Sequence, residues 1–426
     1  MFKVSRSSLF KSSHIYKPQY HFSSNPNKIP IPQPKSKLKL KSIFRGLTKG
    51  LATIAVSYLI YEYNPYMTKI FLSYDPNQFN NNLIYNLESL KDKHFNPCWL
   101  CPTAFLQSVI NTVSHPKPVR YNREPLVLPD GGQITLDWAL PAKKIEYKNT
   151  RYDDRYFPYE PSKDNKILLI MHGLTGGSEC NYIHTLVDTA RKQGYRVAVL
   201  NQRGVNQNLT TPLTFHGGRL DDVEFAINHL KKNYPNAPLV AVGTSIGANM
   251  LIRYLGETSN SRSTLKAGVA LGAPFDLEDT LNSIENTVYE EFFAKTYIEK
   301  NFLPNYELFQ TLKDTHGISV EDVLQAKNIR DFHREFTIKI HNHKDLEDYF
   351  STFKILDSHI KNIDIPLLIL HAKDDPISTY RSIPVDTLKR NPNIIFAETR
   401  RGGHVCWFTG LWPKRVSFLL LRNEFL

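Results

Sequence analysis

Short hydrophobic runs recur through the last two thirds of the chain, separated by longer segments with helical periodicity. Six of these runs have the composition of buried strands, at 166–171, 196–201, 239–243, 266–271, 366–371 and 394–399. Helical patterns at 182–193 and 221–233 fall between them. Strands that alternate with helices form a parallel sheet covered on both faces. The pattern therefore predicts an α/β fold with a mostly parallel twisted sheet.

Other elements are expected ahead of the first run. Alternating hydrophobic residues at 123–138 flank an Asp-Gly-Gly turn at 130–132, which indicates a β-hairpin. Residues 84–112 are apolar and helix-rich, and the charged, tyrosine-rich segment 143–165 is predicted to be a surface loop.

A long insertion separates the fourth and fifth hydrophobic runs. It has roughly ninety residues, far more than a plain crossover needs. Helical patterns at 277–297 and 321–328 favour a helical cap at about 276–360. Open α/β sheets bind ligands at the carboxyl ends of their strands, where such a cap would lie. The alternative is a helical elaboration that does not contact the site.

Charge is concentrated at the N-terminus. Residues 1–61 contain eleven Lys or Arg and no Asp or Glu, whereas the whole chain has 53 basic and 41 acidic side chains. The remainder is therefore close to neutral. A neutral body gives no counterion-release contribution to binding, so we expect no nucleic-acid partner.

Residues 1–49 are expected to form a basic tail that is rich in Ser, Lys and Pro. A mitochondrial transit peptide and a disordered basic arm that touches anionic lipid both fit this composition. The uncharged stretch 50–61 is shorter than the roughly twenty residues of a spanning helix. We predict a membrane-associated segment within 50–74, as an anchor or an interfacial helix. The expected location is a membrane, mitochondrial or elsewhere in the cell.

The cysteine content indicates neither a disulfide scaffold nor a metal centre. There are four cysteines, and Cys98 and Cys101 have the spacing of half a zinc site. No second pair and no suitably spaced histidine accompanies them. We expect no metal and no organic cofactor.

The third run ends in Gly-Thr-Ser-Ile-Gly at 243–247, and a helix-forming segment follows. A strand that turns sharply into a helix exposes the side chain at the turn, here Ser245. Gly243 and Gly247 suit the strained backbone and the close approach of helix to strand. A serine in an ordinary glycine-bearing turn is the alternative.

A nucleophilic serine needs a base, and the base needs a carboxylate to orient it. Asp374 and Asp375 follow the strand at 366–371, and His404 follows the strand at 394–399 after two glycines. This is the chain order expected for the fold. We assign Asp375 as the acid because it directly precedes Pro376, as in many such enzymes, and Asp374 as a turn residue.

Most of the other histidines lie in charged stretches and are predicted to be solvated, without a role. His333, His341 and His343 are examples.

The glycine-rich segment 172–177 follows the first run and can present a backbone N–H to an oxyanion. We predict that the amides of Leu174 and Ile246 form this site. The segment lacks the lysine and the glycine spacing of a phosphate-binding loop.

Several motifs together resemble the α/β-hydrolase superfamily, specifically its membrane-associated abhydrolase-domain branch, which includes animal phospholipases and fungal medium-chain ethyl-ester synthase/esterases. They are Trp99-Leu100, Leu106-Gln107-Ser108, Asp130-Gly131-Gly132, Asp137-Trp138, the 172–177 segment, Asn201-Gln202-Arg203-Gly204, 243–247, Asp374-Asp375-Pro376 and Gly402-Gly403-His404.

The resemblance implies an α/β-hydrolase fold over about 93–426, a triad of Ser245, Asp375 and His404, and an N-terminal membrane segment. Ala104-Phe105 and the segment 348–354 depart from the branch's pattern, which affects substrate identity more than catalysis.

The expected function is hydrolysis of lipid or medium-chain carboxylic esters by a serine hydrolase that forms an acyl-enzyme. Two alternatives remain open. An alcohol O-acyltransferase or ester synthase would use the same triad with an alcohol as acceptor. A non-catalytic binding protein would keep the fold alone.

Overall fold

The structure of the protein is a computed structural model. It describes residues 57–58, 60–61, 63–86, 94–114, 118–145, 155–258 and 264–416. The predicted basic tail at 1–49 lies outside these residues, as does most of the uncharged stretch 50–61 of the candidate membrane-associated segment. Within the described ranges, no helix is both long and apolar enough to cross a bilayer.

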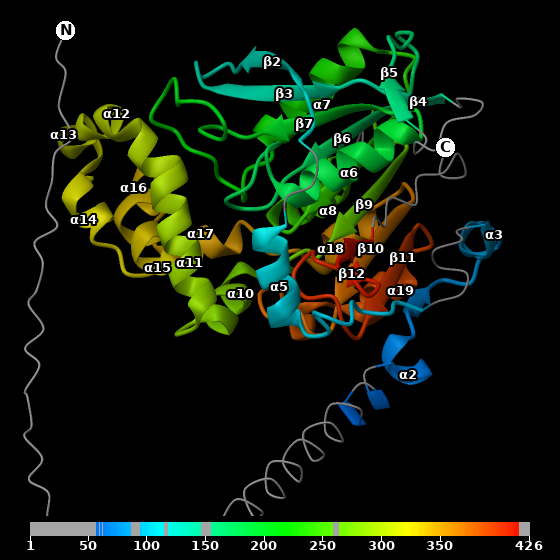
Figure 1. The fold of residues 1–426 in the computed structure, drawn as a ribbon. Coiled ribbons are helices and arrows are strands. Elements are labelled where there is room, and N and C mark those ends of the chain that lie inside the picture. Colours follow the sequence, from blue (N-terminus) through cyan, green and yellow to red (C-terminus); the bar gives the residue numbers. More distant parts are fainter. Residues whose placement is uncertain are drawn as a thin grey trace, which may run out of the picture. The chain divides into compact units, whose positions relative to one another are not determined.

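A nine-stranded sheet forms the centre of the described chain, in the order β1-β11-β10-β9-β8-β6-β7-β3-β2 (Figure 1). All six predicted runs are strands of its parallel part. These strands are β6 (Ile167–Met171), β7 (Arg196–Asn201), β8 (Leu239–Thr244), β9 (Ala267–Leu271), β10 (Leu367–Ala372) and β11 (Ile394–Thr399). The predicted α/β-hydrolase architecture is therefore confirmed.

Antiparallel strands complete the sheet at both edges. The predicted hairpin is β2 (Asn122–Val127) and β3 (Gln133–Ala139), and β3 pairs with β7. At the other edge, β1 (Phe71–Tyr74) pairs with β11. Residues that the sequence analysis grouped with the membrane-associated segment 50–74 thus contribute to the sheet, ahead of residue 93.

The segment predicted as a surface loop at 143–165 contains part of a second, two-stranded sheet. It is formed by β4 (Ala142–Ile145) and β5 (Arg155–Pro158). Near the C-terminal end, β12 (Phe408–Thr409) and β13 (Lys414–Arg415) form another short pair.

The alternation of side chains along the strands explains why helices cover both faces of the main sheet. In β6, Leu168 and Ile170 pack on the side of α6 (Asn181–Lys192). Ile167, Leu169 and Met171 point to the opposite side, which holds α7 (Asp221–Asn233) and α8 (Ile246–Glu257). Every residue of β6 is buried. Burying one aliphatic side chain of this kind stabilises the folded state by about 1.5–3 kcal/mol relative to leaving it exposed.

The remaining helices outside the insertion are shorter. They are α2 (Pro65–Thr68), α3 (Gln78–Asn86), α5 (Ala104–Val113), α18 (Asp357–Asn362), η4 (Tyr380–Ser382) and α19 (Val385–Arg390).

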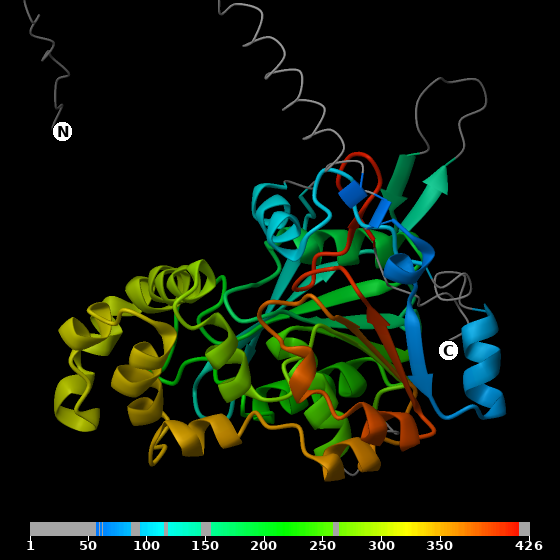
Figure 2. The same ribbon diagram turned by 90° about the horizontal axis from the view of Figure 1, so that it is seen from below.

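The insertion between β9 and β10 is helical and gathers beside the sheet (Figures 1 and 2). Aromatic rings fill its interior, with Phe302, Phe309, Phe332 and Phe336 in mutual contact. Its elements are α10 (Leu277–Ile284), α11 (Val288–Tyr297), η1 (Ile298–Phe302), η2 (Leu303–Asn305), α12 (Tyr306–Gln310), α13 (Leu312–His316), α14 (Val320–Leu324), α15 (Ile329–Phe332), η3 (His333–Thr337), α16 (Ile338–Ile340) and α17 (Leu346–Ser351).

The predicted helix 277–297 is two helices. Asn286 has a left-handed backbone, with φ of 57°. Thr287 then caps α11 by accepting a hydrogen bond from the amide of Tyr289. Both residue types favour local side-chain hydrogen bonds and caps over a helix interior, so the chain turns between α10 and α11.

Candidate active site

Ser245 lies at a sharp turn between β8 and α8, with φ of 52° and ψ of −121°. A positive φ is costly for a residue with a side chain, so the packing around the turn must enforce it. A Cβ atom on Gly243 would lie 2.3 Å from the Gly247 carbonyl oxygen. One on Gly247 would lie 2.4 Å from the Met171 carbonyl oxygen. Both glycines are therefore required for α8 to pass this close to β8 and β6.

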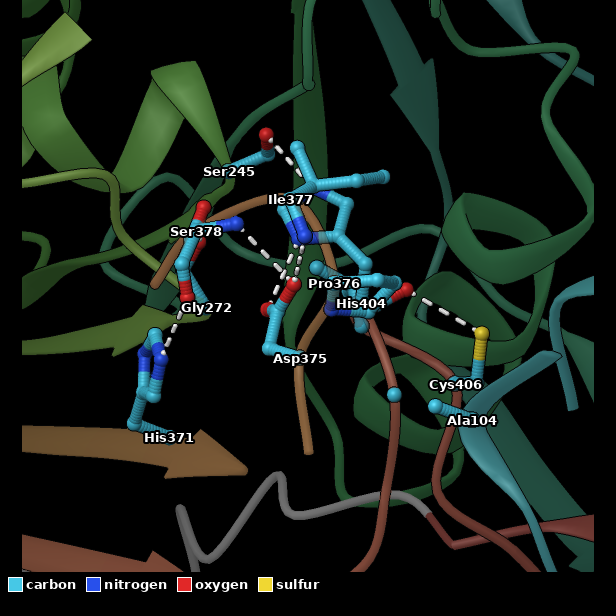
Figure 3. A network of polar contacts seen from close by, with 12 residues as sticks. Ala104, Ser245, Gly272, His371, Asp375, Pro376, Ile377, Ser378, His404 and Cys406 are labelled. Atoms are coloured by element: carbon cyan, nitrogen blue, oxygen red, sulfur yellow. Dashed lines mark hydrogen bonds and ion pairs between the residues drawn. The ribbon is translucent and has the colours of Figure 1, made fainter. Parts of the chain in front are cut away.

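The structure brings together the three side chains that the sequence analysis selected (Figure 3). His404 Nε2 lies 2.8 Å from Ser245 Oγ, and His404 Nδ1 lies 2.9 Å from Asp375 Oδ2. These are hydrogen-bond distances. The imidazole can thus accept the serine proton on one nitrogen while the carboxylate accepts the proton on the other.

Asp375 is held rigidly below the histidine. Its Oδ1 accepts hydrogen bonds from the amides of Ile377, at 2.9 Å, and Ser378, at 3.0 Å. Buried His371 donates from Nε2 to the Ser378 carbonyl at 2.8 Å and so supports the same loop (Figure 3). The side chain of Asp375 is fully shielded from solvent.

The neighbouring Asp374 has a different contact. Its Oδ1 accepts a hydrogen bond from the Gly403 amide at 2.9 Å, next to His404. Burial raises the pKa of Asp374 to about 6, although the Gly403 amide and Arg401 oppose this shift. Asp374 thus fastens the loop that carries the histidine, a role that sequence reasoning missed.

The two predicted oxyanion donors flank Ser245. Gly173 is so close to the serine that a Cβ atom built on it would lie 3.2 Å from Ser245 Cβ. Leu174 follows it, and Ile246 begins α8. Within the described residues, neither the Leu174 nor the Ile246 amide has a hydrogen-bond partner. Both donors are therefore available to a ligand.

Tyr182 and Asp137 position this glycine-rich loop. The Tyr182 hydroxyl accepts a hydrogen bond from the Gly173 amide at 3.0 Å. Asp137 is buried and accepts hydrogen bonds from Arg123, Ser178 and Asn201. Burial raises the pKa of Asp137, but these three donors outweigh it and hold the pKa below its ordinary value. The Asp-Trp and Asn-Gln-Arg-Gly motifs therefore anchor the loop to β3 and β7.

A pocket of about 600 Å³ opens at Ser245 and His404. Its walls come from α5, the segment 173–182, α10 and α11, and they are largely apolar. Besides His404, the charged side chains that line the pocket are Lys300 and Glu179. Lys300 Nζ lies 3.8 Å from Glu179 Oε1. The pocket can thus receive an apolar group next to the serine.

The part of the chain described here contains no cluster of three or more His, Cys, Asp or Glu side chains suited to a metal ion. Cys98, Cys101 and Cys406 are free thiols packed together with Phe408. Burial raises the pKa of both Cys101 and Cys406 to about 12, which keeps these thiols protonated and unreactive.

The expectation of solvated histidines is wrong for His333, which is buried, whereas His341 and His343 are half-buried. His333 is buried against Tyr349, with ring centroids 4.7 Å apart. His343 and His341 meet His216, which precedes α7. Charged neighbours in the sequence suggested exposure, but the insertion folds around His333 and covers part of the other two rings.

Comparisons with known proteins identify the family of the chain. A family model described as the alpha/beta hydrolase fold matches residues 166–405. The chain is 31% identical to phospholipase ABHD3 of Mus musculus, over 71% of this chain and 70% of that protein. It is 31% identical to a monoacylglycerol lipase of Saccharomyces cerevisiae, over 68% and 70%. It is 25% identical to monoacylglycerol lipase ABHD2 of Danio rerio, over 82% and 80%.

Proposed function

The chain belongs to the abhydrolase-domain branch of the α/β-hydrolase family, and from this premise we propose that it hydrolyses carboxylic esters of lipids on Ser245. The observation that carries the proposal is the hydrogen-bonded line from Ser245 through His404 to Asp375 at the floor of an apolar pocket. The relatives named phospholipase and monoacylglycerol lipase support an ester of a lipid as the substrate class.

In the proposed first step, His404 Nε2 takes the proton of Ser245 as the serine oxygen attacks the ester carbonyl. Asp375 holds the ring in the tautomer that leaves Nε2 free, and it stabilises the imidazolium that forms. The same proton then passes to the departing alcohol. Water, activated by His404, cleaves the acyl-enzyme in the second step and releases the carboxylic acid.

We further propose that the amides of Leu174 and Ile246 bind the oxyanion. Ile246 is the first residue of α8, where the helix dipole also favours negative charge. A donor of this kind typically stabilises the transition state by about 3 kcal/mol.

The insertion at about 276–360 acts as a cap in this proposal, since α10 and α11 supply the apolar pocket wall. The apolar walls of the pocket fit a medium-length or longer acyl chain better than a charged group. No cofactor takes part in the proposed reaction.

Hydrolysis of p-nitrophenyl esters with acyl chains of two to sixteen carbons tests the proposal. We expect Ser245→Ala to lose about 10⁴-fold or more of kcat/KM. Ser382→Ala is the matched control, because that hydroxyl donates to the Thr379 carbonyl away from the pocket. Equal rates for wild type and Ser245→Ala would refute the assignment of the nucleophile. Added alcohol distinguishes hydrolysis from acyl transfer by the products formed.

A further inference from the structure

Helix α5 exposes its apolar side chains and buries a polar one, the opposite of an ordinary surface helix. It contains no charged residue, and its one fully buried side chain is the polar Gln107. The apolar residues Phe105, Leu106, Val109 and Val113 are exposed instead, with Phe105 at 55% and Val113 at 59%. An amphipathic helix of a protein surrounded only by water turns its apolar side inward. This helix therefore presents an apolar face that needs a partner.

Two loops extend the apolar face beside α5. Trp99 and Leu100 lie on one loop and Leu411 and Trp412 on the other, all exposed, with Trp412 at 75%. The loops are joined, because the Trp99 amide donates to the Gly410 carbonyl at 3.0 Å.

Gln107 connects these loops to the helix. Its side-chain oxygen accepts a hydrogen bond from the Phe408 amide at 3.0 Å. The buried glutamine thus fixes α5 with its apolar side outward, and Figure 2 shows α5 and the C-terminal loop side by side.

The face continues to the mouth of the pocket. Phe105 and Val109 of α5 line the pocket and are also exposed. On the opposite wall, Val288 and Phe292 of α11 do the same. We call α5, the two loops and the exposed side of α11 the apolar rim. A contiguous exposed apolar surface around a pocket marks an interaction site.

Charge identifies the partner. Helix α5 and the loop of Trp99 carry no charged side chain, whereas α11 exposes Glu291 and Lys295. The sequence that precedes the rim, residues 1–61, is strongly basic. Tyr63, two residues after this segment, lies beside Trp99 of the rim, with ring centroids 5.1 Å apart and ring planes tilted by 34°. Eleven positive charges without a negative one favour an anionic surface, and tryptophan favours the boundary between water and hydrocarbon.

We propose that the apolar rim docks the enzyme on an anionic lipid–water interface, with the pocket mouth facing the lipid. This inference rests on the proposed function, because a lipid ester reaches Ser245 from that side. Docking lets the acyl chain pass from the lipid layer into the apolar pocket without crossing water. The rim gives the hydrophobic part of the binding, and the basic segment gives the electrostatic part.

Flotation of the full chain with phosphatidylcholine vesicles, with and without phosphatidylserine, tests the proposal. The test variant is Leu106→Gln/Val113→Gln/Trp412→Gln, whose residues lie outside the pocket lining. The matched control is Val127→Gln/Leu324→Gln/Leu356→Gln, which replaces exposed apolar residues away from the rim. Thermal unfolding and hydrolysis of the soluble ester p-nitrophenyl butyrate show whether each variant is folded. If the triple variant unfolds, Trp412→Gln in its loop gives the same comparison.

We expect the rim variant to bind vesicles containing phosphatidylserine about tenfold more weakly or worse, while the control binds as wild type. Both should hydrolyse p-nitrophenyl butyrate at the wild-type rate. Unchanged vesicle binding by the rim variant would overturn the proposal and assign binding to the basic segment. Failure of the wild-type protein to bind vesicles would also overturn the proposal. So would a rim variant that differs from wild type in its oligomeric state but not in its vesicle binding. Rim-dependent binding without esterase activity would remove the hydrolase assignment alone.

Discussion

Two adjacent aspartates, Asp374 and Asp375, have different roles because their side chains contact different groups. Asp375 contacts the His404 ring, whereas Asp374 contacts the Gly403 amide one residue earlier. Only the first contacts the imidazole that takes part in the proposed proton transfer. The second is a positioning residue, because its carboxylate acts through the loop backbone.

Substituting each aspartate by asparagine separates these roles. We expect Asp375→Asn to lower kcat by about 10³–10⁴, because the amide leaves His404 in the wrong tautomer. Asp374→Asn should stay within about tenfold of wild type, since an amide oxygen can still accept from Gly403. Steady-state kinetics on one p-nitrophenyl ester measures both. Equal losses would mean that the assignment of the acid is wrong.

The elbow glycines give a second prediction at this scale. Gly247→Ala should destabilise the protein by about 3 kcal/mol or more, because its Cβ would meet the backbone oxygen of Met171, which cannot move aside. Gly317→Ala is the control. It has a positive φ but open space around it, so we expect a loss of about 1 kcal/mol. Urea denaturation compares the two, and equal losses would contradict the steric explanation.

At the scale of elements, the break between α10 and α11 shapes the pocket. Because the chain turns at Asn286, both helices present apolar side chains to the same space. One continuous helix would carry α11 away from Ser245. The turn therefore brings Val288 and Phe292 to the wall opposite α5.

Filling this pocket should change chain-length preference. Leu281 is buried and lines the pocket from α10. We expect Leu281→Trp to lower kcat/KM for long acyl esters by about tenfold or more, since each excluded methylene forfeits about 0.8 kcal/mol, and to spare two-carbon esters. Leu324→Trp on α14, outside the pocket, is the control. A uniform loss across all chain lengths would indicate damage to the fold instead.

At the scale of the whole molecule, histidines join the insertion to the segment before α7. The Gly218 amide donates to His216 Nδ1 at 3.0 Å, and His216 Nε2 lies 2.8 Å from His343 Nε2. His343 Nδ1 lies 2.7 Å from Asp348. When both rings are neutral, His216 Nε2 can donate its hydrogen to His343 Nε2, and His343 Nδ1 can donate to Asp348. Every ring nitrogen then has one hydrogen-bond partner. An added proton would break one of these hydrogen bonds.

The buried rings of His216 and His333 make the stability of the protein depend on pH. Burial, with smaller effects from nearby positive groups, lowers the pKa of His216 and His333 to about 3. The unfolded chain therefore binds more protons, and the free energy of unfolding falls as pH drops from about 6.5 toward 3. We expect each ring to contribute about 1.4 kcal/mol per pH unit in that window.

The variant His333→Gln tests this dependence. Its amide can still bond Thr337, which contacts His333 Nδ1 at 3.0 Å. Urea denaturation between pH 6 and 5 should give a slope shallower than wild type by about 1 kcal/mol per pH unit. Parallel slopes would show that His333 does not take up a proton on unfolding.

Local sequence patterns were enough to predict the six parallel strands, the hairpin, the elbow at 243–247 and the proximity of Ser245, Asp375 and His404. These features follow from local chemistry. Side-chain alternation sets strand burial, glycines permit strained turns, and parallel strands bring their carboxyl ends to one edge.

Long-range contacts were needed to place Asp374 against Gly403, to bury His333, to add β1 to the sheet and to turn the apolar face of α5 outward. Each depends on residues far apart in the chain. Gln107 points inward because Phe408 offers a backbone donor there, and His333 is buried because the insertion folds around it. Local patterns cannot encode such partners, because a side chain's burial is set by the surface that packs against it.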